Sequence, residues 1–136
     1  MRVERGEVAV ETRRPIEVVD VTGIVEGWLR GVGAGDGLLV VRVPHTTAAV
    51  TVNEAEPGLL EDIVEAIRVH FRPGGPWRHN RVDNNAHAHL AASFIGDSRV
   101  VPVAGGRLAL GTWQRILLVE GDGPRRRRLQ LLYIGT

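Results

Sequence analysis

The clearest structural pattern in the chain lies in residues 38–71, which read LLVVRVPHTTAAVTVNEAEPGLLEDIVEAIRVHF. The apolar run at 38–43 is typical of a strand that is buried on both faces, and Pro44 ends it. Residues 48–53 alternate in polarity and predict a second strand. Residues 59–71 predict a helix, because apolar side chains recur at helical spacing: Leu59, Leu60, Ile63, Ile67 and Phe71. This order of strand, strand and helix predicts an α+β fold.

The elements on either side continue the pattern. Before this stretch, two strands are expected at 4–11 and 16–21, and Thr22 is expected to cap a short helix that ends near residue 31. After it comes a polar loop, and Asn85 is expected to cap a helix over 86–94. The last strands are expected at 99–103, 107–110, 115–120 and 128–134. The chain is therefore predicted to form a single domain over residues 1–136.

The amino-acid composition excludes several kinds of catalytic chemistry and binding partner. The chain of 136 residues has no cysteine, and all 17 of its basic residues are arginine. Disulfides, thiolate nucleophiles and Schiff-base lysines are thereby excluded. A net charge of +1 and the lack of a long apolar run argue against nucleic acid or a membrane as a partner. The charged N-terminal stretch predicts a cytoplasmic location, and the scarcity of Cys, Met, Asn and Gln is typical of a thermophile.

All five histidines and all four asparagines fall within residues 45–89, which suggests a functional site. His45 follows the apolar strand, where a rigid scaffold can present a polar group into a cleft; the alternative is a histidine satisfied by a nearby carbonyl. Three neutral imidazoles, from His45, His79 and His89, would suit a divalent metal such as Zn²⁺ with one open position. If residues 86–94 are helical, His87 and His89 point nearly opposite ways, so only one of them can enter such a site. His70 is expected to be a cation at a helix C-terminus.

Other polar residues have both a functional and a structural interpretation. Asn53 and Glu54 would lie near His45 if the strands at 38–43 and 48–53 form a hairpin, and Glu54 could then act as a general base or a ligand; a solvated carboxylate is the simpler interpretation. Asp62 is expected on the polar edge of the long helix. Thr112 and Gln114 could hold a ligand or shape a turn. The arginines at 125–128 could bind a phosphate or only flank a turn.

Several of these motifs together resemble the YjbQ family. They are PHTTAAVTVNE at 44–54, HN at 79–80, NNAHAHLAASFIG at 84–96 and GRLALGTWQRILLVEGDGPRRRR at 106–128. Some members of that family are described as secondary thiamine-phosphate synthases. The resemblance implies a β-sandwich of about seven mainly antiparallel strands with two main helices, in the order ββαββαβββ. It also implies a homotrimer packed through its sheets.

The resemblance also implies roles for particular residues. The metal or anion ligands would be His45, His79 and His89, whereas His87 falls at a variable position. The catalytic residues would be Asn53, Glu54 and Asp62, and the substrate-binding residues would be Thr46, Thr47, Thr112, Gln114 and Arg127. Asn80 stands where an Asp is common in the family, which would weaken a cation site.

Three functions remain open at this point. The resemblance implies an enzyme that couples a pyrimidine pyrophosphate to a thiazole phosphate. A histidine triad does not favour the Mg²⁺ that pyrophosphate chemistry commonly uses, so this activity would be secondary to a metal-assisted hydrolysis or another transfer. The second function is a non-catalytic module that binds a metal or a phosphorylated small molecule. The third is a purely structural trimer, which predicts that the histidines do not converge.

Overall fold

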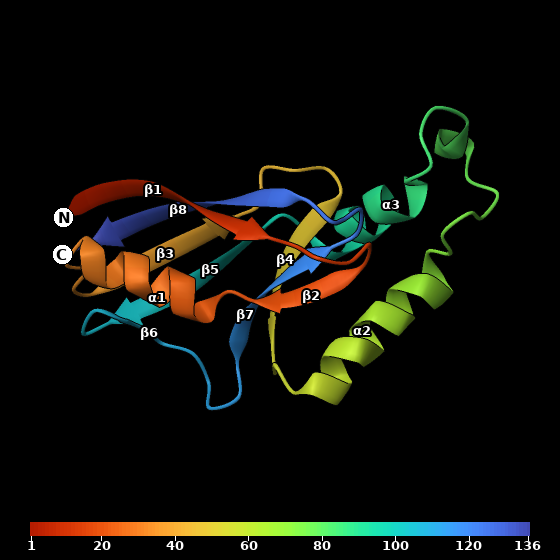
Figure 1. Cartoon of the computed structure of the whole chain (residues 1–136). Helices are drawn as coiled ribbons and strands as arrows, with labels where there is room; N and C mark the ends of the chain where they lie inside the picture. Colours follow the sequence, from red (N-terminus) through yellow and green to blue (C-terminus); the bar gives the residue numbers. More distant parts are fainter.

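The computed structural model describes residues 1–136 and contains two antiparallel sheets and three α-helices (Figure 1). The strands are β1 (Arg2–Glu11), β2 (Glu17–Asp20), β3 (Gly37–Arg42), β4 (Ala48–Asn53), β5 (Ser98–Ala104), β6 (Arg107–Leu108), β7 (Arg115–Glu120) and β8 (Arg126–Gly135). The helices are α1 (Thr22–Gly31), α2 (Pro57–His70), the short 3₁₀ helix η1 (Arg78–Arg81) and α3 (Ala86–Ile95). The predicted α+β sandwich of mainly antiparallel strands is confirmed, and the strand expected at 107–110 is present as the two-residue strand β6.

The larger sheet has the strand order β1-β8-β3-β5-β6 and joins the two ends of the chain. β1 pairs with β8 along its whole length, from Arg2 opposite Gly135 to Glu11 opposite Arg126. Side chains alternate between the two faces of each strand, so Leu129, Leu131 and Tyr133 of β8 point into the core. The opposite face of this sheet carries the intervening residues.

The smaller sheet, β2-β7-β4, lies between the larger sheet and the helices α2 and α3. Residues 116–120 of β7 are all buried, because both faces of this strand are covered. The main core fills the space between the two sheets, and a second core joins the smaller sheet to α2 and α3. Figure 1 shows α2 and α3 on the far side of the smaller sheet from the larger one, with α1 near the opposite end of the sandwich.

The strands at 38–43 and 48–53 do not form a hairpin, so the condition for placing Asn53 and Glu54 near His45 is not met. β3 belongs to the larger sheet and β4 to the smaller one, so residues 44–47 cross from one layer of the sandwich to the other. The two strands are nevertheless placed close to where they were expected. What the pattern could not indicate is the sheet that each strand joins, because this depends on partners far away in the chain.

Of the two predicted helix caps, Thr22 is wrong, whereas Asn85 takes the N-cap position without a side-chain hydrogen bond. Thr22 begins α1, and its hydroxyl accepts a hydrogen bond from the backbone N–H of Ile116 instead of capping the helix. Asn85 is the N-cap residue of α3, but its Oδ1 accepts no hydrogen bond from the first turn, and its Nδ2 donates to Asp122. The cap of α2 is Glu56, whose carboxylate accepts from the N–H groups of Gly58 and Leu59. None of the three α-helices combines the length and apolar character that a membrane crossing requires.

Candidate functional site

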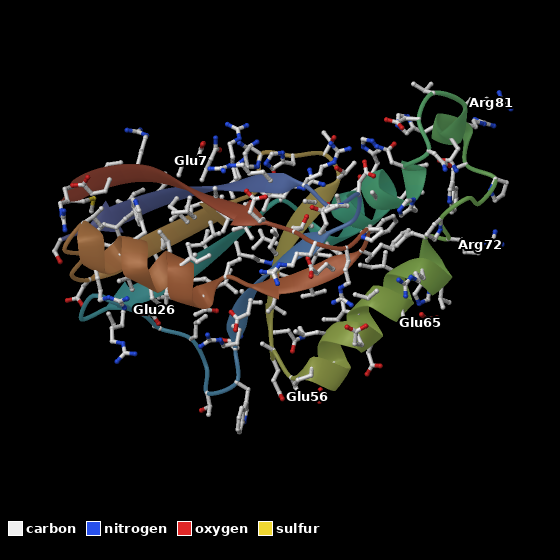
Figure 2. The ribbon with its side chains drawn as sticks, in the orientation of Figure 1. Glu7, Glu26, Glu56, Glu65, Arg72 and Arg81 are labelled. Atoms are coloured by element: carbon white, nitrogen blue, oxygen red, sulfur yellow. The ribbon has the colours of Figure 1, made fainter.

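The three predicted ligand histidines share one open hollow of about 540 Å³. It lies between the crossover at 44–47, the segment around η1, the start of α3 and the turn before β8. Its lining consists of Pro44, His45, Thr46, Thr47, His79, Val82, Asp83, Asn85, His89, Asp122, Arg125 and Arg127. Figure 2 shows Arg81 at the tip of the projecting η1 segment, which brings His79 to one side of this hollow. The structure thus brings together the histidines that the sequence grouped.

His45 is held by the backbone of β8. Its Nε2 accepts a hydrogen bond from the backbone N–H of Arg128 at 3.0 Å. Burial lowers the pKa of His45, and the positive charges of Arg127 and Arg128 lower it further. A backbone N–H can only donate, so the neutral ring carries its proton on Nδ1. His45 is therefore a neutral imidazole whose Nδ1–H is its remaining hydrogen-bond donor.

His79 and His89 form a pair at one wall of the hollow. Their ring centroids are 4.6 Å apart in an edge-to-face arrangement. Neither ring makes a hydrogen bond within the chain, so their nitrogens are free to meet a ligand. A second hollow of about 350 Å³, with Trp77 and Leu90 in its lining, opens on the other side of the same pair. The exposed ring of His79 and the half-buried ring of His89 thus line both concave surfaces.

The η1 segment is tied to α3 by a single side chain. Asn80 accepts a hydrogen bond from the N–H of Ala86 with its Oδ1 and donates to the carbonyl of Gly75 with its Nδ2. An aspartate at this position would lack the donor and lose the second bond. Asn80 therefore acts as the bridge that positions His79, and its amide is not free to coordinate a cation.

The arrangement of the histidines does not fit a three-ligand metal centre. No group of three or more His, Asp or Glu side chains is placed so that it could hold a metal ion. In addition, Nε2 of His45 already accepts the hydrogen bond from Arg128. The Zn²⁺ site expected from the sequence thus finds no support in this geometry, which offers hydrogen-bonding and acid–base groups instead.

Arg127 was expected to bind substrate, but its guanidinium is engaged by the protein. It forms a bidentate ion pair with Glu120, and the side chains of both residues are almost fully buried, at 4% and 0% exposure. The same guanidinium donates to the hydroxyl of Thr47 at 2.8 Å. Although Arg127 lines the hollow, Glu120 neutralises its charge, and the hydroxyl of Thr47 is already engaged by Arg127.

The other three arginines of the run at 125–128 are also paired with carboxylates. Arg125 contacts Asp122 at 3.1 Å, Arg126 contacts Glu11 at 3.4 Å and Arg128 contacts Glu7 at 3.5 Å. Burial would raise the pKa of Asp122, but hydrogen bonds from Asn85 and Arg125 outweigh it and hold the pKa below its usual value. The run therefore stabilises the turn before β8 and the pairing of β8 with β1. It does not form a free basic patch.

The remaining predicted site residues lie elsewhere in the chain. β4 rises about 3.3 Å per residue, so Asn53 and Glu54 end the strand roughly 20 Å from the crossover. Thr112 and Gln114 are exposed in the turn before β7, where the side-chain oxygen of Gln114 accepts from the N–H of Gly111. Asp62 is exposed on α2. Within one chain, these five residues do not contribute to the hollow of the histidines.

α3 explains why His87 stays out of the hollow. His87 is 8% exposed, and its Nε2–H donates to the carbonyl of Gly121 at 3.1 Å, whereas His89 faces the hollow. This separation agrees with the helical spacing of the two residues. His70 ends α2 and is exposed, outside the hollow.

Sequence reasoning missed Glu120, which is the buried partner of Arg127. The signal was present, since Glu120 ends the apolar run ILLVE and a charge inside such a run needs a partner. Asp83 and Asp122 were missed as well, because each stands in a polar turn that resembles any other surface turn.

Comparison with known proteins places the whole chain in one family. The family described as UPF0047 protein YjbQ-like matches residues 6–136. A UPF0047 protein of Archaeoglobus fulgidus is 50% identical over 123 residues, covering 90% of this chain and 95% of its own. A crystal structure of a hypothetical protein from Aeropyrum pernix K1 has a TM-score of 0.96 at 67% identity and covers 98% of this chain and 99% of that one. A YbjQ-like protein of unknown function from Sulfolobus solfataricus has a TM-score of 0.95 at 44% identity, with 99% of both chains covered. The chain belongs to the YjbQ (UPF0047) family.

Proposed function

We propose that this chain is a small-molecule enzyme that binds a phosphorylated ligand in the hollow lined by His45, His79 and His89. The observation that carries the proposal is the convergence of three histidines from a crossover, a 3₁₀ helix and an α-helix on one concave surface. Scattered histidines, as in a purely structural protein, would not share a hollow. Ring nitrogens that the protein itself leaves free are suited to contact a ligand.

The donors around the hollow suit phosphate oxygens. His45 offers Nδ1–H, and the exposed hydroxyl of Thr46 has no partner within the chain. Arg125 keeps part of its guanidinium free beside Asp122. His79 and His89 can donate when they are protonated, or exchange a proton with the ligand when they are neutral. The carboxylate of Asp122 does not oppose an anion strongly, because Arg125 and Asn85 already hold it.

The proposed chemistry is a transfer or hydrolysis at a phosphorylated group. His79 or His89 would act as the acid or base, and His45 would stabilise the charge that develops on a departing oxygen. The synthase-type coupling that releases pyrophosphate is the first such reaction to test. The alternative is a module that binds the same ligand without turnover. Since the histidines are not arranged as a metal centre, no step is assigned to a metal.

Binding of inorganic phosphate and pyrophosphate, measured by isothermal titration calorimetry, tests the proposal. His45→Ala and His89→Ala each remove one group of the hollow, and we expect at least a tenfold loss of affinity for each, because a hydrogen bond to a charged group contributes about 1.5–3 kcal/mol. His70→Ala is the matched control, since His70 is an exposed histidine outside the hollow. Equal binding by all four proteins, or none by the wild type, would contradict the proposal.

We also propose that the chain forms a homotrimer through the outer face of its larger sheet. This face carries a continuous apolar area that no helix covers, made up of Val3, Leu38, Val40, Val100, Pro102, Leu132 and Ile134. These residues are neighbours across four adjacent strands. An apolar patch of this extent is typical of an interaction surface in soluble proteins.

A further inference from the structure

We propose that the buried Glu120–Arg127 ion pair is a positioning device that keeps the proton of His45 on Nδ1, so that His45 serves the site as a hydrogen-bond donor. Arg127 lines the hollow and Glu120 lies beneath it, and both side chains are almost fully buried and engaged with each other. The ion pair holds His45 in this way in the free protein. Only the use of the resulting donor rests on the proposed function.

A hydrogen bond from β8 determines the tautomer of His45. The acceptor of the 3.0 Å hydrogen bond from the backbone N–H of Arg128 is Nε2 of His45. A neutral imidazole has one protonated and one unprotonated nitrogen, and only the unprotonated nitrogen can accept. The proton of His45 therefore stays on Nδ1 for as long as the N–H of Arg128 points at Nε2.

Arg127 holds both ends of that hydrogen bond in place. Arg127 is the chain neighbour of Arg128, and its guanidinium donates to both the hydroxyl and the carbonyl oxygen of Thr47, at 2.8 and 3.3 Å. Thr47 follows His45 by two residues in the crossover. One guanidinium thus fixes the strand that provides the donor and the segment that provides the acceptor.

The ion pair itself cannot easily move. Beyond Arg127, the carboxylate of Glu120 accepts from the hydroxyl of Thr12 at 2.8 Å and from the N–H of Asp122 at 2.9 Å. Both of its oxygens are therefore engaged from several elements at once. Apolar residues often replace a buried ion pair with no loss of stability, so its stability does not account for keeping two buried charges here. A positioning role at the adjacent site does account for them.

The three histidines of the hollow differ in which ring nitrogens they can offer to a ligand. His45 is bound at Nε2 and can offer only Nδ1–H to a ligand oxygen. His79 and His89 have no such restraint and keep either nitrogen available for proton transfer. We therefore assign the donor role to His45 and the acid–base role to the His79–His89 pair.

The test is the tautomer of His45 in the ¹⁵N-labelled full-length protein, read from the ring nitrogen shifts by NMR. In the wild type, we expect a protonated Nδ1, an unprotonated Nε2 and a hydrogen-bonded N–H signal for Arg128. The double variant Glu120→Leu with Arg127→Met removes both charges while filling the space. We expect it to show a mixture of the two tautomers and to lose the hydrogen-bonded signal of Arg128.

The control is Arg126→Gln, which removes a neighbouring but exposed ion pair and should leave the signals of His45 unchanged. If the double variant does not fold, the same NMR measurement on Thr47→Val tests the inference. This variant removes the hydroxyl that Arg127 holds and retains the ion pair. We expect Thr47→Val to weaken the Arg128 hydrogen bond to His45. A wild-type ring protonated at Nε2 would overturn the inference, and so would an unchanged tautomer in the folded double variant or, failing that, in Thr47→Val.

Phosphate binding separates this inference from the proposed function. If the tautomer depends on the ion pair but neither phosphate nor pyrophosphate binds, the positioning role stands and the proposed function fails. If phosphate binds and the tautomer is independent of the ion pair, the positioning role fails alone. If both hold, we expect the double variant to bind phosphate about tenfold more weakly than the wild type, because one directed hydrogen bond is lost.

Discussion

The indole ring of Trp28 occupies the space in which Gly6 would carry a side chain. A Cβ atom at residue 6 would overlap the Nε1, Cε2 and Cζ2 atoms of Trp28. Gly6 lies in β1 and Trp28 in α1, so this contact sets how closely the helix approaches the end of the larger sheet. The glycine is needed for close packing of a helix on a strand.

Gly6→Ala should therefore destabilise the protein by about 1–3 kcal/mol, because the indole must move out of its packed position. Urea denaturation followed by tryptophan fluorescence measures the change in the free energy of unfolding. Gly23→Ala is the control in the adjoining helix, since a Cβ there meets no atom within 4 Å. It should be neutral or stabilising by up to about 1 kcal/mol. A stable Gly6→Ala variant would contradict the packing argument.

The buried ion pair makes a second prediction, this one about stability. Arg127→Met leaves the carboxylate of Glu120 buried without its cation and should cost about 3–5 kcal/mol. Adding Glu120→Leu removes that uncompensated charge and should recover most of the loss. The measurement is the free energy of unfolding of the wild type, the single variant and the double variant. A single variant as stable as the wild type would show that the pair is not as isolated from solvent as the structure indicates.

Elements with a strong local pattern were predictable from the sequence. The strand at 48–53 and the helix near 59–71 were found because polarity alternates in the first and apolar residues recur at helical spacing in the second. The pairing of β1 with β8 was not predictable, because no local pattern links Arg2 to Gly135. Whether the strands at 38–43 and 48–53 form a hairpin could not be decided for the same reason, since nothing in residues 38–53 indicates that β4 pairs with β7.

The candidate site was predictable in part. The histidines could be grouped because they cluster in the sequence, and the structure brings three of them to one hollow. Glu54, Thr112 and Gln114 were grouped with them by the resemblance, but the length of β4 keeps these residues at the other end of the smaller sheet. The ion pair of Arg127 was hidden because its partner, Glu120, lies across a turn in another strand.

The lowered pKa of His45 predicts how the stability of the folded chain depends on pH. Its pKa in the folded chain is lowered, first by burial and then by the charges of Arg127 and Arg128, relative to the unfolded value of about 6.5. Below that value the unfolded chain binds more protons than the folded one, so stability should fall as the pH decreases from about 6.5 towards the folded pKa. Above about 6.5 the contribution should be complete.

An NMR titration of the His45 ring measures this pKa directly. The matching stability test compares the wild type with His45→Asn, whose side-chain oxygen can still accept from Arg128. The stability difference between the two proteins should change with pH below about 6.5 and stay constant above it. A folded-state pKa at or above 6.5 would show that the neutral form is not favoured.

The lowered pKa of Asp20 predicts a loss of stability at low pH. Burial alone would raise its pKa, but hydrogen bonds from Thr22 and Arg115 outweigh burial and lower it. The contribution of the carboxylate should be present above about pH 4 and lost as the pH falls through the lowered pKa. Asp20→Asn should therefore cost about 0.5–1 kcal/mol at pH 7 and less at pH 2, as measured by denaturation at both values. An equal cost at both pH values would mean that the ionised form has no advantage.

The proposed trimer can be tested by placing a charge at each of two equally exposed valines, only one of which lies in the proposed interface. Val100 lies on the outer face of the larger sheet, next to Val40 on β3, and is 60% exposed. Val69 lies on α2 and is 59% exposed, but it is outside the apolar area. A glutamate within an apolar interface must be buried without a partner, so Val100→Glu should reduce the mass in solution from three chains to one. Val69→Glu adds the same charge at a similar exposure and should leave the trimer intact. Light scattering coupled to gel filtration measures both masses, and the proposal fails if the wild type is a monomer at every concentration or if both variants keep the same mass.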